Sequence, residues 1–139
     1  MNLRQMRLVQ QSFAQVLPMA DATADRFYTR LFELNPALRS MFPQDMTMQR
    51  QKFMSMLDTA IDSLDRLEDF IPTIQALGLR HKTYGVTVEQ FDTVREALMW
   101  AFEKNLGAAF TPEVRAAWMA VYTLLANTMQ QATDDVASR

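Results

Sequence analysis

The chain has 139 residues, 49% of them hydrophobic, and a formal net charge of −2 from 14 basic and 16 acidic side chains. This length predicts one domain with a substantial core, and the balanced charge gives no electrostatic reason to expect nucleic acid or a membrane as partner. Because there is no cysteine, disulfides, zinc–thiolate sites, iron–sulfur clusters and cysteine nucleophiles are excluded. No segment is apolar enough to span a bilayer, so we expect a soluble cytoplasmic protein with residues 1–139 as one domain.

Apolar residues recur at helical spacing through the first third of the chain. A first helix is predicted from about Leu3 to Leu17, before Pro18, and a second from about Asp21 to Leu34. The second helix ends at Asn35-Pro36, because the residue before a proline avoids the helical region. A short turn follows, and a loop begins at Pro43. The residues expected to face the core are Met6, Val9, Phe13, Val16, Phe27, Leu31 and Leu34.

The middle of the chain predicts two more helices, from Thr47 to Leu64 and from about Glu68 to Tyr84. Pro72 falls near the first turn of the later helix, where proline is tolerated, and Gly85 is its expected end. The inward-facing residues of the earlier helix are expected to be Phe53, Met56, Leu57, Ala60, Ile61 and Leu64.

The last third has clear start and stop signals. Thr87 and Gln90 match a capping box that opens a helix to about Leu106, and Gly107 stops it. The run Thr111-Pro112-Glu113 combines a cap, a first-turn proline and an acid, and opens the last helix. That helix is expected to reach about Ala132, with a frayed polar tail over 132–139. The prediction is an all-α domain of about six longer helices and one short turn.

The single histidine, His81, lies in the stretch LGLRHKTYGV. A multi-histidine metal site is therefore excluded, and no nucleophile motif marks a serine partner for it. Haem iron needs only one strong protein ligand, because its macrocycle supplies four nitrogens. On a helix, His81 shares an apolar face with Leu77 and Ile74, and the Leu77 carbonyl can accept from Nδ1–H and aim Nε2 at iron. A lone histidine is more often an ordinary helix residue, so both interpretations stay open at this point.

Two other groups of residues, a set of acids and the methionines, have ordinary structural explanations. The acidic residues are best explained as a solvated helix end, and the 11 methionines as core filler. These acids are Asp62, Asp65, Glu68 and Asp69.

Two stretches resemble the globin family, specifically the bacterial single-domain haemoglobins, the globin domain of flavohaemoglobins and neuroglobin-like bacterial globins. LGLRHKTYGV resembles the proximal-histidine segment, and FYTRLFELNPALRSMF resembles helix B, helix C and the start of the CD corner. Pro36 matches the C-helix proline, and Phe42 matches the corner phenylalanine that packs against haem. The resemblance extends from about Leu3 to Gln130.

The resemblance implies a globin fold, with helices A, B, C, E, F, G and H around one haem b (iron protoporphyrin IX). His81 becomes the proximal iron ligand, with Tyr28, Gln49 and Phe53 on the distal side. Lys52 and either Arg80 or Lys82 could pair with haem propionates, although plain surface charges fit equally well. The full set of further haem-contact candidates is Phe42, Leu31, Leu38, Lys52, Met56, Leu77, Arg80, Tyr84, Val86, Phe91, Val94 and Leu98.

The implied function is reversible binding of O2, NO and CO, without catalytic residues, in a monomer or weak homodimer. The alternatives are a nitric oxide dioxygenase served by a separate reductase, a gas-sensing module of a larger signalling protein, and a helical interaction protein without cofactor. Phe91 stands where flavohaemoglobins have a tyrosine, and Thr133 stands near their last-helix glutamate. With no reductase domain in the sequence, these departures disfavour a peroxidase-like or self-sufficient dioxygenase.

Overall fold

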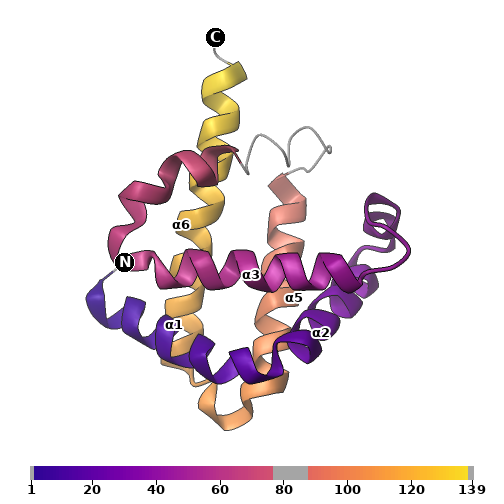
Figure 1. The fold of residues 1–139 in the computed structure, drawn as a ribbon, viewed down its shortest axis with the longest axis horizontal. Coiled ribbons are helices and arrows are strands. Elements are labelled where there is room, and N and C mark those ends of the chain that lie inside the picture. Colours follow the sequence, from indigo (N-terminus) through magenta and orange to yellow (C-terminus); the bar gives the residue numbers. More distant parts are fainter. Residues whose placement is uncertain (1, 77–87, 138–139) are drawn as a thin grey trace.

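The computed structural model describes residues 2–76 and 88–137, and all regular structure within these ranges is helical (Figure 1). The longer helices are α1 (Leu3–Val16), α2 (Ala20–Leu34), α3 (Thr47–Asp62), α5 (Val88–Leu106) and α6 (Pro112–Ala137). The 3₁₀ helices are η1 (Leu17–Met19), η2 (Pro36–Met41), η3 (Leu64–Phe70) and η4 (Gly107–Ala109). Residues 71–76 are also helical. The predicted all-α class is confirmed.

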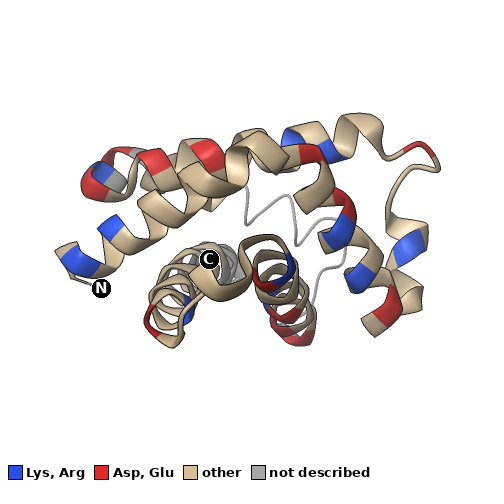
Figure 2. Cartoon of the chain, turned by 90° about the horizontal axis from the view of Figure 1, so that it is seen from below, with Lys and Arg blue, Asp and Glu red and all other residues tan. Residues whose placement is uncertain are grey.

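The helices form two layers that cross at a steep angle (Figures 1 and 2). One layer holds α5 and α6, and the other holds α1, α2 and α3. The main packing between the layers joins α2 to α5 and α1 to α6. The most deeply buried large side chains come from both layers and include Val9, Leu31, Met99, Phe102, Trp118 and Val121. Basic and acidic residues are dispersed over the helices (Figure 2).

Local capping explains where several helices begin and end. The Asn2 side chain accepts from the Gln5 backbone N–H at 2.8 Å, and the Gln5 side chain accepts from the Asn2 N–H at 3.2 Å, which forms a capping box for α1. Thr111 Oγ1 accepts from the Val114 N–H at 3.2 Å, as the predicted start signal of α6 requires. Gly107, with φ of 55°, ends α5 in the left-handed region that glycine favours.

Two predicted helix boundaries differ clearly from the structure. The helix expected from Glu68 is preceded by η3 and its regular α-helical turns start at 71, next to Pro72. Arg66, with φ −135° and ψ 40°, breaks the helical path in between. The last helix continues to Ala137, beyond its predicted end at about Ala132. No glycine or proline interrupts that segment, so nothing in the local sequence stops the helix. The predicted capping box of Thr87 with Gln90 involves a residue outside the described ranges.

Two predicted core positions point outward instead. Leu34 and Met56 are each 38% exposed, whereas Tyr28 and Met54 are buried, at 5% and 6%. A helix buries only the arc that faces its neighbours, so apolar residues at the edge of that arc stay in solvent. Within the described ranges, no helix is long and apolar enough to cross a membrane.

A buried polar contact joins the two layers at their centre. Trp118 Nε1 on α6 donates to Ser12 Oγ on α1 at 2.8 Å, and the Ser12 hydroxyl lies within bonding distance of the Leu8 and Val9 carbonyls. Ser12 is 5% exposed and Trp118 is 2% exposed. The indole N–H therefore has a partner without any break in the core.

We expect Ser12→Ala to lower the free energy of unfolding by about 1–3 kcal/mol, because it leaves a buried indole N–H without its acceptor. Urea denaturation measures this loss of unfolding free energy. The slope of free energy against urea concentration should be the same in the wild type and the variant. The control is Ser40→Ala, since Ser40 is exposed and bonds only locally to the Ala37 carbonyl. Equal midpoints for both variants would contradict a stabilising role for the interlayer bond.

Candidate functional site

Tyr28 lies on α2 at the centre of an aromatic cluster that comprises Phe27, Tyr28, Phe32, Phe42 and Phe53. Its ring centroid lies 4.8 Å from Phe27, 5.5 Å from Phe42, 5.6 Å from Phe53 and 6.1 Å from Phe32. Three of these contacts are edge-to-face, an arrangement favoured by the ring quadrupole. The cluster thus joins α2, the residue that follows η2, and α3 around one phenol.

The Tyr28 hydroxyl has one polar side-chain partner in this apolar surrounding. Gln49 Nε2, on the first turn of α3, donates to the Tyr28 hydroxyl oxygen at 3.2 Å. Because the phenol oxygen accepts this bond, its own hydrogen remains available to donate elsewhere. The sequence-based prediction placed Tyr28 and Gln49 on one site, and the structure brings them into direct contact.

Burial is the main influence on the Tyr28 phenol. It raises the pKa of Tyr28 above the ordinary value of 10.0, because an apolar surrounding disfavours the phenolate. The hydrogen bond from Gln49 acts in the opposite direction and lowers this pKa. Tyr28 is therefore a neutral hydrogen-bond donor at physiological pH.

Arg39 fixes the corner that carries Phe42. Its guanidinium donates to the carbonyls of Phe42 at 3.3 Å, Pro43 at 2.9 Å and Gln44 at 3.0 Å. The same guanidinium lies over the Phe32 ring, 5.4 Å from its centroid. This one side chain therefore satisfies three loop carbonyls and holds Phe42 against Tyr28. Sequence reasoning missed Arg39, and its place just before the predicted loop at Pro43 was the available signal.

The start of α3 is fixed by two further contacts. Asp45 Oδ1 accepts from the Thr47 N–H at 3.0 Å, and this backbone hydrogen bond lowers the pKa of the Asp45 carboxyl. Arg50 on α3 pairs with Asp21 on α2 at 3.1 Å. Gln49 lies between these two contacts, and the Arg50–Asp21 pair ties the adjacent residue of α3 to α2.

On α5, the predicted pocket residues Val94 and Leu98 pack in the core, with Leu98 3% exposed. The backbone carbonyl of Phe91 accepts a hydrogen bond from the Tyr122 hydroxyl of α6. Burial raises the pKa of Tyr122, which keeps this phenol protonated. Sequence reasoning missed Tyr122, because a bond from a side chain to a distant backbone carbonyl leaves no residue-type pattern.

The remaining predicted site residues fall into three groups. Leu31 and Leu38 are buried in the core, while Lys52 and Met56 are exposed. His81, proposed as the iron ligand, lies outside the described residues. So do Leu77, Arg80, Lys82, Tyr84 and Val86.

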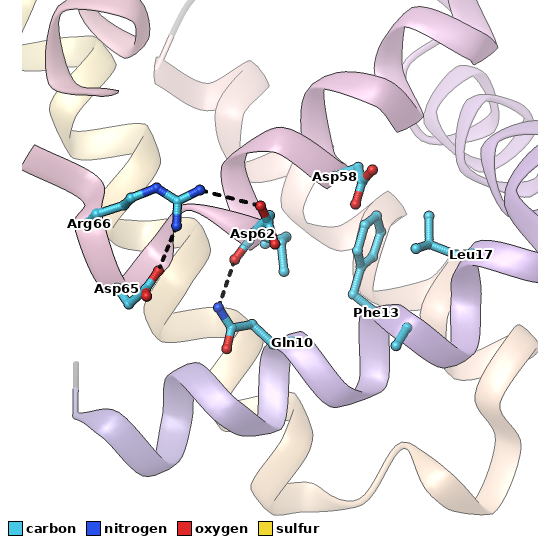
Figure 3. A pocket seen from close by; sticks show the side chains of 9 residues that line it. Gln10, Phe13, Leu17, Asp58, Asp62, Asp65 and Arg66 are labelled. Atoms are coloured by element: carbon cyan, nitrogen blue, oxygen red, sulfur yellow. Dashed lines mark hydrogen bonds and ion pairs between the residues drawn. The ribbon is translucent and has the colours of Figure 1, made fainter. Parts of the chain in front are cut away.

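A separate pocket lies between α1 and the C-terminal end of α3. It is lined by Phe13, Leu17 and three aspartates, among other residues (Figure 3). Arg66 pairs with Asp62 at 3.5 Å and with Asp65 at 3.6 Å, and the Gln10 amide donates to the Ile61 carbonyl at 3.1 Å. These acids are exposed, as predicted for a solvated helix end. Among the described residues no cluster of acids and histidines suits a metal ion.

The structure thus shows an all-helical domain with a buried tyrosine–glutamine pair between α2 and α3, and comparison with known proteins gives the family. The model of the globin family matches residues 25–129, and the chain belongs to this family. Neuroglobin of Danio rerio is 31% identical over 116 residues, which cover 73% of each chain. Neuroglobin-1 of Oncorhynchus mykiss is 30% identical over 118 residues, which cover 75% of this chain and 74% of that one.

A solved structure extends the likeness over nearly the whole chain. It is an engineered carbene transferase based on a candidate nitric oxide dioxygenase from Rhodothermus marinus, with a TM-score of 0.87 and 25% sequence identity. The match covers 99% of this chain and 96% of that one. The predicted globin fold is thereby confirmed.

Membership of the globin family implies haem binding. The described residues fit such a group on one side, because an aromatic wall and two side chains able to donate hydrogen bonds meet at Tyr28 and Gln49. Phe42, at the corner after η2, contributes an apolar ring to the same wall.

We expect Tyr28 to be more than half protonated at pH 10, where a free tyrosine is half ionised, and Gln49→Leu to raise its pKa further by removing a hydrogen bond that favours the phenolate. Carbon-13 NMR of ring-labelled tyrosine measures this, with the signal assigned by its loss in Tyr28→Phe. N-acetyltyrosinamide in the same buffer is the reference.

The direction in which stability changes with pH follows from the raised pKa of Tyr28. The contribution of Tyr28 to stability is fully present below pH 10 and is lost as the pH rises through the folded-state pKa. A Tyr28 signal half ionised below pH 10, or a pKa lowered by Gln49→Leu, would contradict the burial and hydrogen bond described.

Proposed function

We propose that this protein binds haem b through His81 and reversibly binds O2, NO and CO on the side formed by Tyr28 and Gln49. The observation that carries the proposal is the 3.2 Å hydrogen bond between these two side chains inside an aromatic cluster. A structural tyrosine needs one partner to satisfy its hydroxyl in a core. Here the partner donates, which leaves the phenol hydrogen available to another acceptor.

A haem would supply an iron that holds a diatomic gas reversibly, and the chain supplies the surroundings. The Tyr28 hydroxyl donates to a ligand that carries partial negative charge. The Gln49 amide, by donating to the same phenol oxygen, polarises the O–H and strengthens it as a donor. Phe42 and Phe53 keep water from competing for these donors. His81 is the sole histidine of the chain and is proposed as the proximal ligand on the basis of sequence.

The energetic consequence favours oxygen over carbon monoxide. A hydrogen bond to a charged group stabilises by about 1.5–3 kcal/mol. Since each tenfold change in a binding constant corresponds to about 1.4 kcal/mol, one such donor slows release by roughly ten- to a hundredfold. Carbon monoxide is less polar when bound and gains less from the same donor.

We therefore predict that Tyr28→Phe speeds oxygen release by about ten- to a hundredfold and changes carbon monoxide release less. Flash photolysis and stopped-flow replacement of the two gases give both rates. The matched control is Tyr122→Phe, which removes the same hydroxyl from a buried tyrosine of α6. Because the Tyr122 hydroxyl bonds to the Phe91 carbonyl and not to Tyr28 or Gln49, its removal should affect both gases alike and leave their ratio unchanged. Equal effects of Tyr28→Phe on both gases would refute hydrogen-bond donation.

A second candidate is a nitric oxide dioxygenase that receives electrons from a separate reductase. The structural similarity to a protein based on a candidate nitric oxide dioxygenase favours it. A strong donor such as Tyr28 suits this reaction too, because it retains oxygen until nitric oxide arrives. The two candidate functions differ in whether a supply of electrons from a reductase sustains repeated consumption of nitric oxide.

We predict that nitric oxide is consumed stoichiometrically, about one equivalent per oxygen-loaded protein. Stopped-flow measurement with and without an added cellular reductase and NADH tests this. Heat-inactivated reductase is the control. Many turnovers with active reductase, and one without it, would assign the protein to the enzyme class instead.

A further inference from the structure

Phe27 and Phe53 lie face to face within the aromatic cluster. Their ring centroids are 4.4 Å apart and their planes differ by only 8°. Phe27 belongs to α2 and is 2% exposed, whereas Phe53 belongs to α3 and is partly accessible. The stacked pair is therefore a further direct contact between the helices that carry Tyr28 and Gln49.

Tyr28 meets both stacked rings at their edges. The interplanar angles are 67° with Phe27 and 64° with Phe53, at centroid distances of 4.8 and 5.6 Å. Each of the three rings contacts the other two. A shift of Phe53 relative to Tyr28 therefore disrupts the stacking of Phe53 on Phe27. Gln49 and Phe53 are four residues apart on α3 and share one side of that helix. Phe53 thus lies next to the place where the phenol and the amide meet.

We propose that Phe27 is a specificity-determining residue that acts through Phe53. By stacking on Phe53 it holds that ring beside the Tyr28–Gln49 donors, so only ligands of diatomic size enter. This inference rests on the proposed function, because it concerns ligand size at the same site. Phe27 itself touches no ligand and is a positioning residue.

The physical reason is the packing of the ring pair. A larger ligand must displace Phe53, and this breaks the stacking contact of that ring with Phe27 and its contact with Tyr28. Replacing Phe27 by a smaller, non-planar side chain removes the stacking surface and opens space on the side away from the ligand. Phe53 can then withdraw into that space, and the site accepts bulkier molecules.

The test compares carbon monoxide with n-butyl isocyanide as ligands of the ferrous haem protein. For Phe27→Leu and Phe27→Met, which both replace the ring by a smaller, non-planar side chain, the association rate of the isocyanide should rise about tenfold or more, equivalent to roughly 1.4 kcal/mol off its entry barrier, with carbon monoxide changed by less than about threefold. The control is Phe13→Leu, which removes an equally buried ring that contacts Trp118 on α6. It should leave the ratio of the two rates unchanged.

A second readout is independent of ligand entry. In the wild-type carbon monoxide form, NMR should resolve separate signals for the two edges of the Phe53 ring, because a stacked ring cannot rotate unless its partner moves. In the Phe27 variants these signals should merge.

An unchanged isocyanide-to-carbon monoxide ratio in both Phe27 variants, or freely averaged Phe53 signals in the wild type, would overturn the inference and leave the proposed function standing. A wild-type protein that binds neither haem nor carbon monoxide would instead overturn the proposed function and the inference with it.

Discussion

The hydrogen bond from the Gln49 amide to the Tyr28 hydroxyl joins α2 and α3 at the point on which the proposed chemistry depends. Three sets of neighbouring contacts limit the movement of these two side chains. The aromatic cluster excludes solvent, the Arg39 contacts hold the corner, and the Arg50–Asp21 pair fastens α3 next to Gln49. A donor held in this way loses little entropy when a ligand arrives, which is the general advantage of a preorganised site.

The two-layer architecture supports this site from a distance. The Ser12–Trp118 bond joins α6 to α1, and the buried side chains of α5 and α6 pack in the same core as those of α2. The likeness to neuroglobins spans about three quarters of the chain, while the likeness to the bacterial structure spans nearly all of it. The globin assignment therefore rests on sequence and on fold together, whereas the ligand preference rests on a few side chains of this chain.

Helical periodicity and end signals were sufficient to predict α2, α3, α5 and the start of α6, because those signals act within one or two turns. The sequence also paired Tyr28 with Gln49, but only through family resemblance, since their contact is set by how α2 and α3 cross. Periodicity alone put Met56 inside instead of Met54, because the position of the buried arc depends on neighbouring helices. For the same reason, periodicity could not predict the Tyr122 hydrogen bond to the Phe91 carbonyl or the Phe27–Phe53 stack. The role of His81 remains a prediction.

The most direct test of the account is the absorbance spectrum of the purified chain after haem reconstitution, recorded for the wild type and His81→Ala in ferric, ferrous and carbon monoxide forms. The account predicts a Soret band in the wild type that shifts reversibly with carbon monoxide, and weak haem retention in His81→Ala. A wild-type protein without a Soret band, or a His81→Ala variant with an unchanged spectrum, would contradict it.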